Sequence, residues 1–276
     1  MTTAPKLEPV ALAVEACRRL WQARDHALLL GIPLLALGVG WDIVYGDDLR
    51  ALLLVLAEAP TMTEAEIARL QGEVMGLASL YVIPSMLLQA ILFGNLARLL
   101  LIGPPAIRPL LGLALDTRLL TVVWRFVQIM LIALVASVAI SLPLGMVIGV
   151  ASMAGNIGLG VGLLAGMAAG LAILVICLRL SIAAAATAID RPMRLFEAWR
   201  ATAGNATGLL GAILAANLPA VGIGFLLSAL LSAILPTMTM TTTLLLNLVA
   251  LVSSLLSMSV VAVATERLLK KPAPRD

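Results

Sequence analysis

The sequence has few of the side chains that carry out chemistry. It contains one histidine and two cysteines, and only 12% of its residues are charged. Metal sites usually combine several Cys, His or carboxylate side chains, and acid–base catalysis most often uses histidine. The single histidine, His26, lies next to an apolar stretch, where a solvated side chain is expected. We therefore identify no catalytic, cofactor-binding or metal-binding residue in the sequence.

Aromatic residues are also scarce, with four Phe, two Tyr and four Trp. Aliphatic residues supply most of the apolar content, which reaches 62%, and the mean hydropathy is +1.09. Soluble domains are only about 45–50% apolar. The composition excludes a soluble domain and predicts an all-α, multi-pass membrane helix bundle that forms a single domain over residues 1–276.

Six apolar runs are long enough to cross a bilayer, whose hydrocarbon layer of about 30 Å needs about 20 helical residues. We place these spans at residues 27–45, 74–97, 119–142, 157–178, 206–231 and 243–263. Four connecting or terminal segments on one side of this arrangement hold nearly all of the 18 Lys and Arg residues, and only Arg50 and Arg69 fall on the other. The positive-inside rule then places both termini in the cytoplasm.

The charge distribution also bears on location and on partners. Acidic residues between Asp42 and Glu73 gather on or near the first outer loop, opposite to the basic side. The net charge of +3 therefore indicates topology and not nucleic-acid binding. Arginine far outnumbers lysine, as expected of a GC-rich bacterial genome. We expect a protein of the bacterial inner membrane.

Two segments on the basic side predict amphipathic helices in the membrane interface. In residues 9–25, Val10, Val14, Cys17 and Trp21 share one helical face. Such a helix lies in the interface with its apolar face toward the acyl chains.

The second amphipathic helix is predicted from Asp190, which would act as its N-cap, to residue 203. Phe196 and Trp199 lie on its apolar face, whereas Glu197 and Arg200 occupy the polar part of the helix. Two interpretations remain open: the helix lies on the membrane, or it forms a contact surface for a cytoplasmic protein. Phe196, Glu197, Trp199 and Arg200 are therefore candidate contact residues.

Glycines recur every fourth residue in the fourth span, at Gly158, Gly162, Gly166 and Gly170. This spacing puts them along one helical stripe, where a neighbouring backbone can approach closely. The stripe predicts a helix-packing seam. The alternative is a flexible gate.

Local signals predict how the outer segments are built. Residues 49–56 are apolar but too short to cross, so we expect a separate short helix there. Thr63 and Glu66 form a capping box, which predicts that the next helix begins outside the membrane. Pro143 is expected to bend or end the third run.

Three arginines near span ends are candidate contacts for lipid headgroups, namely Arg118, Arg125 and Arg179. Arg118 and Arg125 are seven residues apart and share a helical face, so they could instead hold an anionic substrate. Near a helix end, long basic side chains more often extend to the headgroups.

The segments on the basic side also suggest an internal repeat. Glu15-Ala-Cys-Arg18 is similar to Glu197-Ala-Trp-Arg200, and Ile107-Arg-Pro109 is similar to Asp190-Arg-Pro192. Each precedes a pair of spans. We therefore expect three units, each an interfacial helix followed by a hairpin.

Between residues 175 and 210 the sequence resembles a known family. The motifs are Arg179-Leu-Ser-Ile, the small run at residues 183–186, Ile189-Asp190, Glu197-Ala-Trp-Arg and Gly204-Asn205. They resemble six-helix bacterial membrane proteins of the glycerophosphoryl diester phosphodiesterase membrane-domain family. This sequence departs from that pattern at Ala185, where the family often has proline, and at Ala203, where it often has a basic residue. The chain has no room for an attached phosphodiesterase domain, so the resemblance implies the membrane bundle and not the enzyme.

The leading hypothesis is a non-enzymatic inner-membrane protein that acts as an assembly or lipid-associated factor. The alternative is a permease subunit of a transporter driven by a separate ATPase, because a Glu-Ala helix between the fourth and fifth spans resembles the coupling loop of such permeases. Gly204 comes one residue late for that motif. The expected partners are membrane lipids and a protein at the cytoplasmic face; nucleic acid and cofactors are not expected.

Overall fold

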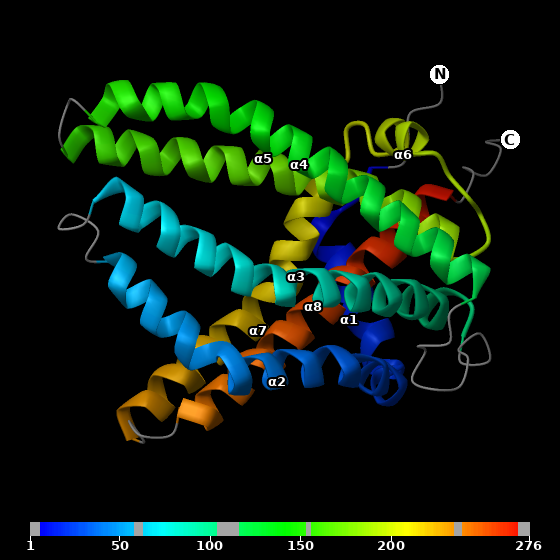
Figure 1. The fold of residues 1–276 in the computed structure, drawn as a ribbon. Helices are drawn as coiled ribbons and strands as arrows, with labels where there is room; N and C mark the ends of the chain where they lie inside the picture. Colours follow the sequence, from blue (N-terminus) through cyan, green and yellow to red (C-terminus); the bar gives the residue numbers. More distant parts are fainter. Residues whose placement is uncertain (1–5, 58–62, 104–115, 153–155, 235–238, 270–276) are drawn as a thin grey trace, which may run out of the picture.

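The computed structural model describes residues 6–57, 63–103, 116–152, 156–234 and 239–269, and the regular elements in these ranges are all α-helices (Figure 1). They are α1 Pro9–Gln22, α2 Arg24–Ala57, α3 Glu64–Leu101, α4 Thr117–Ser152, α5 Asn156–Ala188, α6 Leu195–Ala201, α7 Ala206–Ile234 and α8 Thr239–Leu269. Six of them, α2, α3, α4, α5, α7 and α8, are long and apolar enough to cross a membrane. The predicted class, an all-α multi-pass membrane bundle, is confirmed.

The long helices form three antiparallel hairpins, α2–α3, α4–α5 and α7–α8 (Figure 1). The short helices α1 and α6 lie at one end of the molecule together with the C-terminal end of α8, and we call this end the base. The opposite ends of the hairpins are called the tips. Figure 1 shows that the hairpins lie together at the base and spread apart toward the tips.

The helices pack in a cyclic order around the second helix of each hairpin. These second helices, α3, α5 and α8, contact one another. Each first helix then packs on the second helix of a different hairpin: α2 on α8, α4 on α3, and α7 on α5. The short helices follow the same order, because α1 packs on α8 and α6 packs on α5. The arrangement is therefore an approximate three-fold repeat of hairpins.

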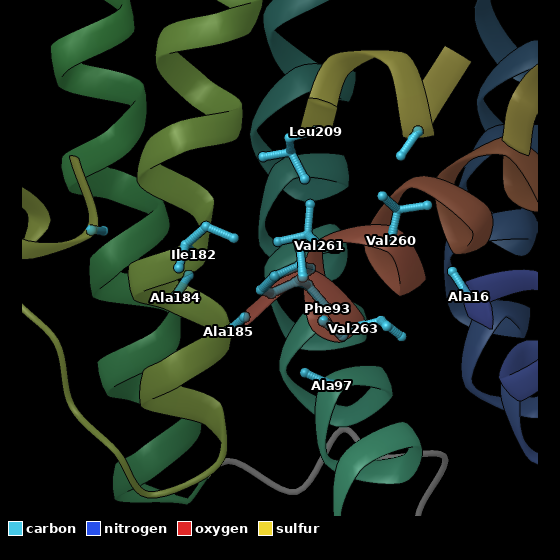
Figure 2. Close-up of a cluster of buried hydrophobic side chains, with 14 of the residues drawn as sticks. Ala16, Phe93, Ala97, Ile182, Ala184, Ala185, Leu209, Val260, Val261 and Val263 are labelled. Atoms are coloured by element: carbon cyan, nitrogen blue, oxygen red, sulfur yellow. The ribbon is translucent and has the colours of Figure 1, made fainter. Parts of the chain in front are cut away.

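The tightest part of the core lies near the base, where small side chains let the helices approach closely. Residues 183–186 of α5 are all alanine and fully buried, and they face a buried Val and Ala segment of α8 that includes Val261 and Val263 (Figure 2). Phe93 and Ala97 contribute from α3. The bundle is therefore closed at the base by packed side chains.

Two of the three predicted repeat units are present as a short helix followed by a hairpin. Ala16 in α1 and Ala198 in α6 come from the two similar Glu-Ala-x-Arg motifs, and both have 0% exposure. In each unit this alanine is the contact point of the short helix with the bundle. The segment expected to precede the second hairpin, residues 104–115, lies outside the described residues.

One expectation about the tips is wrong. Residues 49–56 do not form a separate helix, because α2 continues through them to Ala57. Pro143, which was expected to bend or end the third run, does not end it, since α4 continues past it to Ser152, and a bend there stays a prediction. Proline is tolerated inside membrane helices where neighbouring groups satisfy the freed carbonyl. At 1.5 Å per residue, α2 and α4 are each about 50 Å long and extend beyond a 30 Å hydrocarbon layer.

The predicted start of α3 is confirmed. Thr63 is its N-cap, and the Glu66 backbone N–H donates to Thr63 Oγ1 at 3.4 Å. The Thr63 backbone N–H in turn donates to Glu66 Oε2 at 2.9 Å. This reciprocal pair is the capping box that the sequence indicated.

Candidate functional site at the base of the bundle

Arg179 holds the short helix α6 against α5. Its Nε donates to Thr202 Oγ1 at 2.9 Å and its Nη2 donates to the Trp199 carbonyl oxygen at 2.5 Å. The guanidinium carbon also lies 3.5 Å from the centre of the Trp199 ring, a cation–π contact. Arg179, a candidate headgroup contact, therefore also links α5 to the segment that carries α6.

The helix that contains Trp199 is shorter than predicted, and the predicted N-cap is wrong. α6 begins at Leu195 with Arg194 as N-cap, and the Arg194 backbone N–H donates to Glu197 Oε2 at 2.9 Å. Asp190 instead lies at φ 62°, in the left-handed region that a non-glycine residue rarely adopts. Its carboxylate pairs with arginines of α3 and α4.

Asp190 bridges two arginines from different hairpins. Its carboxylate lies 3.2 Å from Arg98 Nη1 on α3 and 3.1 Å from Arg118 Nε on α4. Arg98 Nη1 also donates to the Ala188 carbonyl oxygen at 2.9 Å. The interaction joins the base ends of α3, α4 and α5, so Arg118 is already paired within the protein.

Arg125 is the third candidate headgroup contact. Its Nη1 donates to Gln128 Oε1 at 2.9 Å on the same helix. Its Nε is buried and has no hydrogen-bond partner in the part of the chain that the structure describes. A buried guanidinium nitrogen without a hydrogen-bond partner is costly.

An apolar groove of about 480 Å³ lies between α4, α5 and α6. The residues that line it are Ile132, Ile176, Leu180, Leu195, Phe196 and Trp199. Phe196 is 63% exposed, and Arg200 covers one side of its ring with the guanidinium carbon 4.4 Å from the ring centre. The groove therefore combines an apolar lining with two cations, since Arg179 contacts Trp199 in the same way.

On the other side of the base, an ion-pair network joins α1 to the end of α8. Arg19 contacts Glu15 at 2.5 Å and Glu266 at 2.6 Å, and Glu15 also accepts from Arg267. Burial raises the pKa of the Glu15 carboxyl, but hydrogen bonds and charges from Arg267 and Arg19 more than offset it, so the pKa lies below its ordinary value.

The predicted apolar face of α1 is directed away from the bundle. Val10, Val14 and Trp21 are 68%, 62% and 69% exposed, whereas the buried side of α1 is formed by Leu12, Ala13 and Ala16. An exposed apolar stripe next to a charged face is the pattern of a helix in the membrane interface. Arg24 lies 4.9 Å from the Trp21 ring and extends the stripe with a cation.

No sequence pattern indicated the contact that holds the start of α1 in place. The Leu7 backbone N–H donates to Asn205 Oδ1 at 2.9 Å, and the Leu7 carbonyl oxygen would lie 2.6 Å from a Cβ at Gly208. Pro9 similarly lies 3.2 Å from a Cβ position at Gly211. Two glycines one turn apart on α7 therefore leave room for the backbone that leads into α1.

A second polar cluster lies nearer the tips. Asp42, expected at the edge of an outer loop, lies within α2 and accepts from Asn247 Nδ2 of α8 at 2.7 Å. A Cβ at Gly38 would lie 2.2 Å from Asn247 Oδ1, so this glycine makes room for the amide. The Trp41 ring centre lies 5.5 Å from that of Tyr81 on α3. The cluster joins α2, α3 and α8.

The predicted glycine seam makes no close contact at the two positions for which the surroundings are described. A Cβ at Gly166 or Gly170 would meet no heavy atom within 4 Å. Gly162 is half-buried, and the surroundings of Gly158 lie outside the described residues. Close approach occurs instead at Gly224, where a Cβ would lie 2.6 Å from Val249 Cγ2. The packing seam at Gly158, Gly162, Gly166 and Gly170 stays a prediction.

The described residues hold no group of three or more His, Cys, Asp or Glu side chains placed to bind a metal ion. Their notable chemistry is cationic and apolar, and it lies at the base. Comparison with known protein families, curated proteins and solved structures found no match.

Proposed function

We propose that this is a non-enzymatic protein of the bacterial inner membrane that associates with anionic lipids of the cytoplasmic leaflet. The base faces the cytoplasm in this proposal, because the two basic residues expected on the opposite side, Arg50 and Arg69, lie toward the tips of α2 and α3. With six spans, both termini lie on the cytoplasmic side.

The observation that carries the proposal is the exposed face of α1. Val10, Val14 and Trp21 are left mostly exposed by the residues that the structure describes, and Arg18 and Arg24 lie beside them. The opposite side of α1 is fixed by burial of Ala16 and by the ion pairs of Glu15 with α8. A helix that is fixed in this way holds its apolar stripe at one level of the bilayer, where basic residues attract anionic headgroups.

The test is native mass spectrometry of protein released from membranes in mild detergent. We expect retained phosphatidylglycerol or cardiolipin in excess of phosphatidylethanolamine. The double variant Arg18→Gln/Arg24→Gln should lose that preference, whereas Arg50→Gln/Arg69→Gln at the tips is the matched control and should keep it. Equal lipid retention by both double variants would reject the proposal.

The permease alternative is favoured by one observation of its own. The exposed side of α6 presents Phe196, Glu197 and Arg200 between the fourth and fifth spans, where a coupling helix would contact an ATPase. Recovery of an ATPase subunit with the purified protein, and its loss in Phe196→Ala, would establish this alternative. Recovery of lipid alone from both proteins would reject it.

A further inference from the structure

We propose that the groove between α4, α5 and α6 binds one acyl chain of an anionic membrane lipid, with the headgroup at the arginines of the base. The inference rests on the proposed function and names a lipid-binding site for it. It concerns a different surface from the exposed stripe of α1, so the two can be tested separately.

Comparison of the two short helices shows why a groove exists at α6. α1 packs on both helices of the hairpin α7–α8, and the glycines of α7 let the backbone of Leu7 approach closely. α6 packs on α5, where Trp199 and Thr202 are bound by Arg179. Between α6 and α4 the apolar groove remains, with Phe196 of α6 and Ile132 of α4 in its lining.

The lining of the groove selects an aliphatic occupant. All six lining residues are apolar, and they come from three helices that a lipid can reach from the surrounding bilayer. The volume of about 480 Å³ falls in the range of small-molecule sites, about 300–1,000 Å³. Along α5 the lining runs from Leu180 to Ile176, toward the tips, which is the direction in which an acyl chain leaves its headgroup.

The charges around the groove select an anionic headgroup. Arg200 contacts Phe196 and Arg179 contacts Trp199, so two guanidiniums flank aromatic rings of the lining at its base side. Arg125 lies two turns before Ile132 on the same face of α4, again toward the base, and its buried Nε has no partner among the described residues. Guanidiniums bind phosphate oxygens strongly through charge-assisted hydrogen bonds.

The experiment uses the whole protein in phosphatidylethanolamine vesicles that contain a small fraction of photoactivatable phosphatidylglycerol, with a diazirine at the end of one acyl chain. After illumination, cross-linked residues are located by mass spectrometry. We expect them around Ile132 and Ile176. The same probe on phosphatidylcholine should label these positions several-fold less, and inorganic phosphate in excess should not compete.

Two variants on α4 provide the comparison. Ile132→Trp puts bulk into the groove and should reduce this labelling several-fold. Leu134→Trp adds the same bulk about 200° around the helix, on an exposed position, and should leave it unchanged. Equal labelling of both variants, or labelling spread evenly along α4, would overturn the proposal. Equal labelling by the phosphatidylglycerol and phosphatidylcholine probes would overturn the assignment of an anionic headgroup.

The lipid association of α1 is tested independently of the groove. If Arg18→Gln/Arg24→Gln leaves lipid retention unchanged while Ile132→Trp abolishes labelling, the proposed association through α1 fails and the groove stands. If retention depends on Arg18 and Arg24 but labelling does not depend on Ile132, the groove fails and the association stands.

Discussion

The backbone of Leu7 is bound to Asn205, 198 residues later in the chain, through a buried hydrogen bond of 2.9 Å. This contact connects the segment that leads into α1 to the start of α7. It depends on Gly208, whose missing side chain leaves room for the Leu7 carbonyl.

Gly208→Ala should therefore destabilise the protein. The added Cβ would lie 2.6 Å from a backbone oxygen, which cannot rotate away as a side chain can. We expect a loss of about 1–3 kcal/mol, typical of overpacking, measured as a lower midpoint of thermal unfolding in detergent. Gly222→Ala is the control, because a Cβ there meets nothing within 4 Å. An equal loss in both would contradict the role of the Leu7 carbonyl, because helix propensity alone favours Ala over Gly.

Trp199→Ala should destabilise the α5–α6 junction even in the isolated protein. It removes the ring on which Arg179 stacks and part of the buried surface beneath α6. Truncation of a fully buried Trp costs about 3–5 kcal/mol, and we expect about 2–4 because Trp199 is only partly buried. Arg194→Glu, on an exposed residue, should change stability little. A stable Trp199→Ala protein that loses a bound ATPase subunit would instead favour the permease alternative.

Acid should weaken the contact between α1 and α8. The pKa of Glu15 in the folded protein is lowered from its ordinary 4.5, so its contribution is present above that pH and is lost as pH falls through the lower, folded value. The pKa of Arg19 is raised above its ordinary value, because Glu266 and Glu15 outweigh its burial, and its contribution is fully present at any working pH.

The measurement is the rate at which a thiol reagent labels Cys17, a half-buried free thiol on α1, in the variant Cys177→Ala. Labelling, corrected for the fraction of thiolate, should accelerate as the pH falls below 4.5 and through the lower folded pKa of Glu15, where the ion pairs are lost. Glu15→Gln should label rapidly throughout and show no such step. A step of equal size in Glu15→Gln would assign it to another group.

Asn247→Ala should destabilise the link between α2 and α8. It leaves the half-buried Asp42 carboxylate without its amide donor, which costs about 1–3 kcal/mol. Asp42→Ala/Asn247→Ala should be less destabilised than the sum of the two single variants, because the second substitution removes the group left without a partner. Additive losses in this double-mutant cycle would show that the two side chains are not coupled.

Reporter fusions test the orientation. Fusions after Pro60 and after Thr239 should report export, and fusions after Arg200 and at the C-terminus should report the cytoplasm. Exported signal from the C-terminal fusion would contradict both the orientation and the assignment of six spans.

The elements that the sequence predicted correctly are those with local causes. Long apolar runs are sufficient to predict the six membrane helices, and the capping box requires only Thr63 and Glu66, three residues apart. The ends of α2 and α4 were missed because hydropathy measures where a helix leaves the hydrocarbon and not where it stops. Pro143 does not end α4, since proline ends helices in water more strictly than in membranes.

The site was harder to predict from the sequence, because its contacts join segments that are distant along the chain. Asp190 has the local sequence of an N-cap, yet it pairs with Arg98 and Arg118, which are 92 and 72 residues earlier. No local pattern reports such a pairing. Phe196 and Trp199 were identified as candidates from helical periodicity, but the groove they line also needs Ile132 of α4, whose position follows only from the packing of the hairpins.

The cyclic packing order has a consequence for biosynthesis. The ribosome completes α1 and α2 first, yet α1 packs on α7 and α8, and α2 packs on α8 as well as on α3. Asp42 of α2 and Glu15 of α1 therefore meet their partners on α8, Asn247 and Arg267, only when the last helix has been synthesised. A nascent chain that stops before α8 would lack both partners.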